Sequence, residues 1–168
     1  MVTVELLKGL GLFKGLTDSE LARIAELCHL YSLHEGDRIL EEGTRATNLH
    51  LCCSGKVDIV IWVKKPWNQY VTVYQAQPGE PFGWSALVAP YTYSASAVCV
   101  EDGEEIRITG SDLLALFRQY PHMGYTIMEN LSADIGAWLV QTRERLIAEW
   151  LSTAGPTSST AWGEPKRR

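Results

Sequence analysis

The chain has 168 residues, of which 46% are hydrophobic and 21% charged, and its formal net charge is -5. This length suits one domain with a buried core, and the negative charge disfavours a nucleic-acid surface, which depends on clustered Lys and Arg. No apolar run is long enough to cross a membrane and no signal-peptide pattern opens the chain, so we expect a cytoplasmic protein that contacts neither membrane nor nucleic acid.

The first segment, residues 1–28, has a helical pattern. Three glycines interrupt the apolar residues of 2–16, which predicts short helical turns, because Gly destabilises a helix interior by about 1 kcal/mol. Thr17 and Glu20 form a capping box, and the apolar residues behind it recur at helical spacing. The sequence therefore predicts a helix over 18–28.

Between residues 29 and 110 the hydrophobic period falls to two, and turn residues recur. This pattern is typical of short antiparallel strands in a sandwich or barrel. Asp102-Gly103 is interpreted as a hairpin turn. The predicted strands cover residues 30–35, 38–42, 48–53, 56–63, 70–75, 93–98 and 104–109.

The stretch from Gly79 to Val98 holds the candidate ligand pocket. A glycine flanked by small residues lets backbone amides point into one concavity, as phosphate-binding loops do. The candidate pocket residues are Phe82, Gly83, Trp84, Ser85, Ala86 and Leu87, followed by Tyr93, Ser94, Ala95 and Ser96.

These residues resemble the phosphate-binding cassette of cyclic-nucleotide-binding domains of the catabolite-activator and FNR type. That cassette reads F-G-E-x-A-L, a gap, and R-S/T-A-S/T, where the Glu holds the ribose hydroxyl and the Arg holds the cyclic phosphate. In this chain Trp84 stands at the Glu position and Tyr93 at the Arg position. The resemblance therefore implies a degenerate cassette with an intact frame and neither ligand-holding charge.

Two further motifs extend the resemblance to roughly residues 10–150. Residues 34–43 are similar to the family's E-G-D-x-I-x-x-E-G signature, and residues 54–57 to its S-G-x-V turn. The resemblance implies a mainly β fold, an eight-stranded antiparallel jelly roll (double-stranded β-helix) at 29–110. It also implies flanking N-terminal helices and a long C-terminal dimerisation helix.

Residues 111–151 are predicted to form C-terminal helices, a short one followed by a long one from Pro121. The long pattern has near-heptad apolar spacing, and in the family this helix pairs with its twin and covers the ligand pocket. From Ser152 to Arg168 the composition shifts to small and polar residues, which predicts a disordered tail. The residues expected at the dimer interface are Leu131, Ile135, Trp138 and Thr142.

No metal or cofactor is expected. The chain has no C-x-x-C pair and no H-x-H pair, which removes the usual zinc, redox and cupin signatures, and its four cysteines fit buried free thiols. The serines of the cassette lack an acid or His placed to activate them. His122 is the candidate axial ligand if the chain resembles the family's haem-binding members.

The sequence thus predicts a non-enzymatic sensory or regulatory domain, a homodimer that signals through its C-terminal helix. Its expected partner is a small-molecule ligand of a non-standard kind or a regulatory protein, and an empty pocket without any ligand is the other case. Trp84, Tyr91 and Tyr93 either fill the pocket or line it for a flatter, less charged ligand. Two alternatives stay open: a weak but genuine cAMP- or cGMP-binding module, and a haem- or metal-binding jelly-roll protein.

Overall fold

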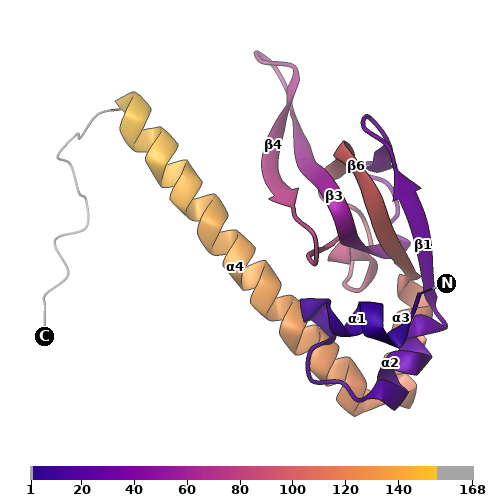
Figure 1. Ribbon diagram of the computed structural model, residues 1–168. Helices are drawn as coiled ribbons and strands as arrows, with labels where there is room; N and C mark the ends of the chain where they lie inside the picture. The colour runs from indigo at the N-terminus through magenta and orange to yellow at the C-terminus, as the bar shows by residue number, and fades with distance from the viewer. Residues whose placement is uncertain (1, 155–168) are drawn as a thin grey trace, which may run out of the picture.

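The computed structural model describes residues 2–154 and has a β-sheet body, helices packed at one end and a long helix that leaves the body (Figure 1). Two short elements open the chain, α1 (Val4–Lys8) and the 3-10 turn η1 (Gly11–Phe13), as the glycine spacing predicts. Helix α2 (Asp18–Ala25) follows the predicted capping box: Thr17 N donates to Glu20 Oε2 at 2.8 Å, and Glu20 N donates to Thr17 Oγ1 at 3.4 Å.

Within the described residues the sheet has six antiparallel strands rather than eight. Its main path runs β1-β6-β3-β4, while β2 pairs with β6 and β5 pairs with β3. The mainly β fold with flanking helices is confirmed, and the strand count differs because predicted neighbouring strands are continuous. The strands are β1 (Cys28–Leu33), β2 (Arg38–Leu40), β3 (Asn48–Val63), β4 (Gln69–Ala76), β5 (Pro81–Phe82) and β6 (Ser96–Thr109).

The predicted hairpin turn at Asp102-Gly103 is wrong, because both residues lie inside β6. Gly103 pairs with Leu33 of β1, and Ser54-Gly55 of β3 lies against it from the other side. A Cβ on Gly103 would stand 2.1 Å from the Ser54 carbonyl oxygen. The glycines here allow the backbones of the paired strands β3 and β6 to approach closely where their register shifts. The sequence pattern instead predicts a turn at this point.

Two apolar clusters lie on the two faces of β3 and β6. Leu49 and Leu51 face the helices, whereas His50 and Cys52, one residue along, point into the roll, as strand alternation requires. The helical cluster includes Leu21, Ile24, Leu113, Ile127 and Leu131, and the interior cluster includes Val57, Phe82, Tyr93, Ala97 and Cys99. The cassette therefore borders the interior of the roll.

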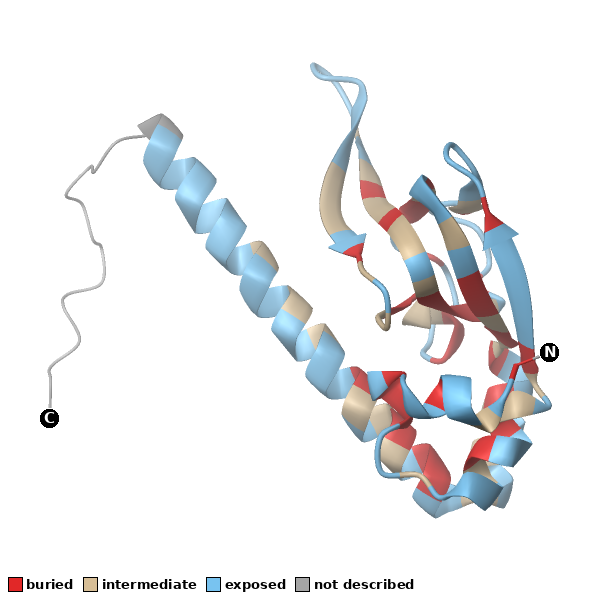
Figure 2. Cartoon of the chain, viewed as in Figure 1, coloured by how far each residue is buried: buried red, intermediate tan, exposed pale blue. Residues whose placement is uncertain are grey.

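The last two helices are α3 (Gly110–Gln119) and α4 (Pro121–Ala154). The first part of α4 is buried through Met123, Ile127 and Leu131, whereas its far half is exposed (Figure 2). Residues 152–154 of the predicted disordered tail continue α4, and the rest of that tail lies outside the described residues. None of the helices in residues 2–154 combines the length and apolar character of a membrane span.

Candidate functional site

The cassette begins where β5 pairs with the start of β3. Phe82 lies opposite His50, and the chain then turns at Gly83, whose φ is 69°. Only glycine adopts this left-handed conformation without strain, and a Cβ here would also stand 3.0 Å from the His50 ring. The turn starts a short 3-10 helix, η2 (Trp84–Ala86), of which Trp84 is the first residue.

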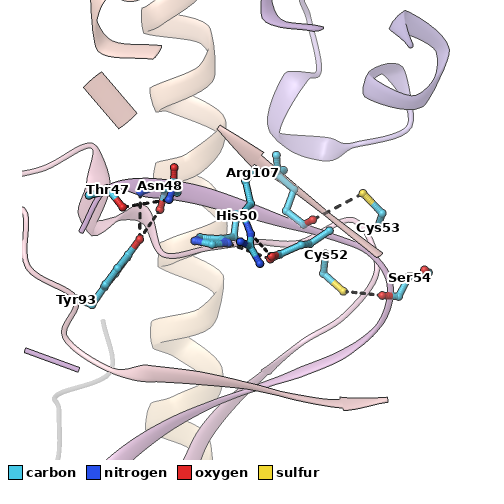
Figure 3. A network of polar contacts seen from close by, with 10 residues as sticks. Thr47, Asn48, His50, Cys52, Cys53, Ser54, Tyr93 and Arg107 are labelled. Carbon is cyan, nitrogen blue, oxygen red and sulfur yellow. Dashed lines mark hydrogen bonds and ion pairs between the residues drawn. The ribbon is translucent and has the colours of Figure 1, made fainter. Parts of the chain in front are cut away.

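Tyr93 is held against the roll by one hydroxyl group. It is buried, and its hydroxyl donates to the Asn48 carbonyl at 3.0 Å and accepts from the Asn48 N–H at 3.1 Å (Figure 3). The main-chain groups at the start of β3 thus occupy the polar end of this side chain. Tyr93 forms a fixed wall at the position where the family pattern has the phosphate-holding Arg.

An aromatic cluster ties the cassette to α4. The rings of Trp84 and Trp138 meet edge to face with centroids 5.6 Å apart, and Trp138 meets Tyr74 of β4 in the same manner at 5.8 Å. Such pairs contribute about 0.5–1.5 kcal/mol each beyond the area they bury. The side chain at the family's Glu position therefore contacts the long helix.

A cavity of about 170 Å³ lies between the cassette, the inner strands and α4. None of the described residues that line it is charged. Seven of the predicted pocket residues are among them, while Ala86, Leu87 and Ser96 are not; Ser96 is buried and accepts a hydrogen bond from Glu42 N at 3.0 Å. The lining is Leu40, Ile59, Ile61, Val73, Phe82, Gly83, Trp84, Ser85, Tyr93, Ser94, Ala95 and Trp138.

The strand residues and Trp138 were missed as pocket residues. The alternation of Ile59 and Ile61 indicates one buried face of a strand, but nothing in the pattern shows that this face meets the cassette. Trp138, which the near-heptad spacing predicts at the dimer interface, also lines the cavity of its own chain.

The other predicted interface residues also face this chain's own body. Leu131 is 1% exposed in the helical core, Ile135 packs against that core, and Thr142 is partly buried with its hydroxyl enclosed. The side of α4 that carries the predicted dimer interface is therefore partly covered by the chain's own body, and its role in a dimer stays a prediction.

The histidines and cysteines are dispersed. His29, His34 and His122 are exposed, and only His50 is buried. In the part of the chain that the structure describes, no group of three or more His, Cys, Asp or Glu could hold a metal ion. Burial raises the pKa of the Cys28 and Cys52 thiols to about 12, so both stay protonated at neutral pH.

Repulsion between two carboxylates beside the aromatic cluster, Asp134 and Glu80, opposes the docking of α4. The Tyr74 hydroxyl donates to Glu80, and Asp134 of α4 faces the same carboxylate. Partial burial, and then the charge of Glu80, raise the pKa of Asp134. Docking disfavours the ionised form of Asp134. The ionised carboxylate therefore destabilises the docked helix once the pH rises above the raised pKa, and this penalty is absent at low pH, where Asp134 is protonated in the docked and undocked states alike.

We expect Asp134→Asn to stabilise the protein at pH 7, by no more than about 0.5 kcal/mol because the pair is partly exposed. The gain should shrink as pH falls toward 4. Urea unfolding at several pH values measures it, with Glu144→Gln, an exposed change on the same helix, as the control. A gain that is independent of pH would exclude charge repulsion as its cause.

Known proteins match this chain in sequence and in fold. The chain matches the cyclic nucleotide-binding domain family over residues 30–120, more than half of its length. The chain belongs to this family. A curated relative, the cyclic AMP receptor protein of Thermus thermophilus, is 32% identical over 121 residues, which are 72% of this chain and 55% of the relative. The chain thus spans about half the length of that relative.

Two solved structures of the cyclic nucleotide-binding family resemble this chain closely. One is a protein of Geobacter metallireducens described as cyclic nucleotide-binding, with a TM-score of 0.74 and 30% identity, covering 83% of this chain and 99% of that one. The other is the catabolite activator protein of Thermus thermophilus, with a TM-score of 0.66 and 31% identity over 84% and 63% of the two chains. As a cyclic nucleotide-binding domain, this chain keeps the glycine turn and places aromatic rings around it.

Proposed function

We propose that this chain is a non-enzymatic, cytoplasmic regulatory domain whose cassette cavity binds a small uncharged molecule and transmits binding through α4. The supporting observation is the cavity itself, about 170 Å³ with no charged residue in its described lining. An apolar cavity of about 150 Å³ holds benzene, whereas sites for drug-sized ligands are roughly 300–1,000 Å³. The ligand class that fits is a single aromatic ring or a molecule of similar size.

The route to α4 is the Trp138 ring. It lines the cavity and contacts both Trp84 and Tyr74, so a bound molecule touches the helix directly. A ligand shifts a conformational equilibrium only through contacts that differ between the two states. A ring stacked between cassette and helix has such contacts when α4 is docked and loses them when α4 moves away.

The alternative, a genuine cyclic-nucleotide site, is favoured by family membership and by the intact turn at Gly83. A cyclic nucleotide would need the Trp138 ring to move and its phosphate charge to be paired. Among residues 2–154 the cavity lining offers no cation for this, so we rank this function second.

Calorimetry with phenol and benzamide tests the proposed ligand class. We expect saturable binding with dissociation constants of about 1 mM or tighter and a negative heat-capacity change. Ala95→Leu fills the cavity and should abolish binding, while Ala133→Leu on the exposed side of α4 should leave it unchanged. Absence of saturable binding, or equal binding by the Ala95→Leu variant, would contradict the proposal.

We also propose that the chain forms a homodimer through the outward side of α4. Val140, Ile147 and Leu151 are 43%, 49% and 51% exposed. They recur at intervals of seven and four residues on the side opposite Trp138, which matches a helix-pairing stripe. Leu139 and Leu146 widen this stripe on one flank.

Val140→Asp with Ile147→Asp should convert the dimer to a monomer and change the melting temperature of the protomer little, since both side chains are exposed. Leu131→Asp should unfold the domain instead, because Leu131 is 1% exposed in the core. Light scattering at tens of micromolar, with circular dichroism, separates the two effects. If the unmodified chain is monomeric at that concentration, the homodimer is excluded.

A further inference from the structure

A polar groove of about 340 Å³ lies next to the apolar cavity, and Leu40 and Tyr93 line both. Three arginines face it, Arg38 from β2, Arg45 from the loop before β3, and Arg107 from β6. Such a concentration of guanidinium groups is unexpected in a chain with a net charge of -5. Glu41 also lines the groove, so its described lining has a net positive charge, opposite to that of the protein.

A fully buried carboxylate supports this groove. Glu105 is 0% exposed; its Oε2 lies 2.9 Å from Nδ1 of His50, and its Oε1 accepts from Nε of Arg107. A buried carboxylate costs several kcal/mol unless it is paired, so Glu105 is retained here with two donors. Since a carboxylate only accepts, Nδ1 of His50 is the donor. Glu105 thus fixes the orientation of two side chains that line the groove.

Arg107 is held from a second direction as well. Its guanidinium lies over the Tyr31 ring, 4.1 Å from the centroid. Because Nε is used by Glu105, the terminal N–H groups stay available to an acceptor in the groove, where the side chain is 31% exposed. A guanidinium fixed in this way loses little conformational entropy when it binds an oxyanion.

The charges around the groove do not cancel. Arg38 pairs with Glu41 at 3.5 Å, and Arg107 pairs with Glu105. Among residues 2–154, no carboxylate lies within ion-pair distance of Arg45. The guanidinium of Arg45 has no carboxylate partner there, and that of Arg107 is held in place. Together they suit one oxyanion that accepts hydrogen bonds through two oxygens.

We propose that this groove binds a small molecule through a carboxylate or phosphate group, held by Arg45 and Arg107. The site is separate from the apolar cavity and does not depend on the function proposed for it. Asn48 also lines the groove, and its main-chain groups hold the Tyr93 hydroxyl. An anion bound here therefore contacts the residue whose main chain fixes the wall of the cassette.

Isothermal titration with inorganic phosphate and with malonate, at constant ionic strength set by chloride, tests the proposal. We expect saturable binding of at least one anion, with a dissociation constant of about 1 mM or tighter. The preference between the two probes distinguishes a phosphate from a carboxylate ligand. Arg45→Gln should weaken binding at least tenfold without affecting the fold, because Arg45 is exposed in a loop.

Arg118→Gln is the matched control. Arg118 shares a neighbouring cavity with Arg45 but does not line the groove, so this variant should bind within twofold of the unmodified chain. Arg107→Lys keeps the charge next to Glu105 and should weaken binding as well, since a lysine cannot form the bidentate contact. Binding by neither anion, or an equal loss in the Arg118→Gln variant, would overturn the assignment of the groove.

Discussion

Cyclic AMP and cyclic GMP are expected to bind the unmodified chain with dissociation constants weaker than about 100 μM. The loss of a buried bidentate contact between Arg and phosphate removes roughly two to three decades of affinity. Neither an indole N–H nor a phenol replaces a carboxylate and a guanidinium, since each is a single neutral donor. The Tyr93 hydroxyl is moreover already bonded to Asn48.

Restoring the family's charges tests whether the backbone frame still functions. Trp84→Glu with Tyr93→Arg supplies both groups, and Trp138→Ala adds the room that the cavity lacks. We expect this triple variant to bind cyclic AMP at least tenfold more tightly than Trp138→Ala alone, the control that adds room without charge. Calorimetry on both variants and on the unmodified chain gives the comparison.

Micromolar binding of cyclic AMP by the unmodified chain would contradict this expectation. The phosphate would then need a cation from outside the cassette, and Arg45 is a candidate because its groove shares Leu40 and Tyr93 with the cavity. Arg45→Gln decides that case: a loss of cyclic-nucleotide binding would locate the phosphate in the groove.

Gly103→Ala is expected to destabilise the domain by about 3 kcal/mol or more, in the range of severe overpacking. The added Cβ would stand 2.1 Å from the Ser54 oxygen and 2.4 Å from its carbonyl carbon, both backbone atoms of β3 that cannot rotate away. Relief would require β3 and β6 to separate where they pair. Urea unfolding monitored by circular dichroism measures the effect.

Gly11→Ala is the matched control, because a Cβ on Gly11 meets no atom within 4 Å and its φ lies outside the left-handed region. We expect a change below about 1 kcal/mol there. If Gly103→Ala were equally mild, Gly103 would not lie in the close crossing, and the hairpin interpretation of Asp102-Gly103 would regain support.

Local patterns in the sequence predicted local structure well. The Thr17-Glu20 box predicted the start of α2, and the glycine spacing predicted the broken helical turns before it, because caps and glycines act within a few residues. Alternation likewise placed the strand segments. It failed at Ser54-Gly55 and Gly103. The sequence does not distinguish a glycine in a turn from a glycine where two paired strands approach closely.

The sequence by itself determined the family, the glycine frame of the cassette and the absence of its two charged side chains, since these depend on residue identity at fixed spacing. Only the tertiary structure decided the position of Trp138, whose heptad spacing fits a partner helix as well as the chain's own roll. The same apolar spacing serves packing on a partner helix and packing on the chain's own roll. The angle at which α4 docks on the body therefore determines which residues face the roll. The groove of Arg45 and Arg107 likewise required the fold, because the loop before β3 and strand β6 bring together residues 62 positions apart.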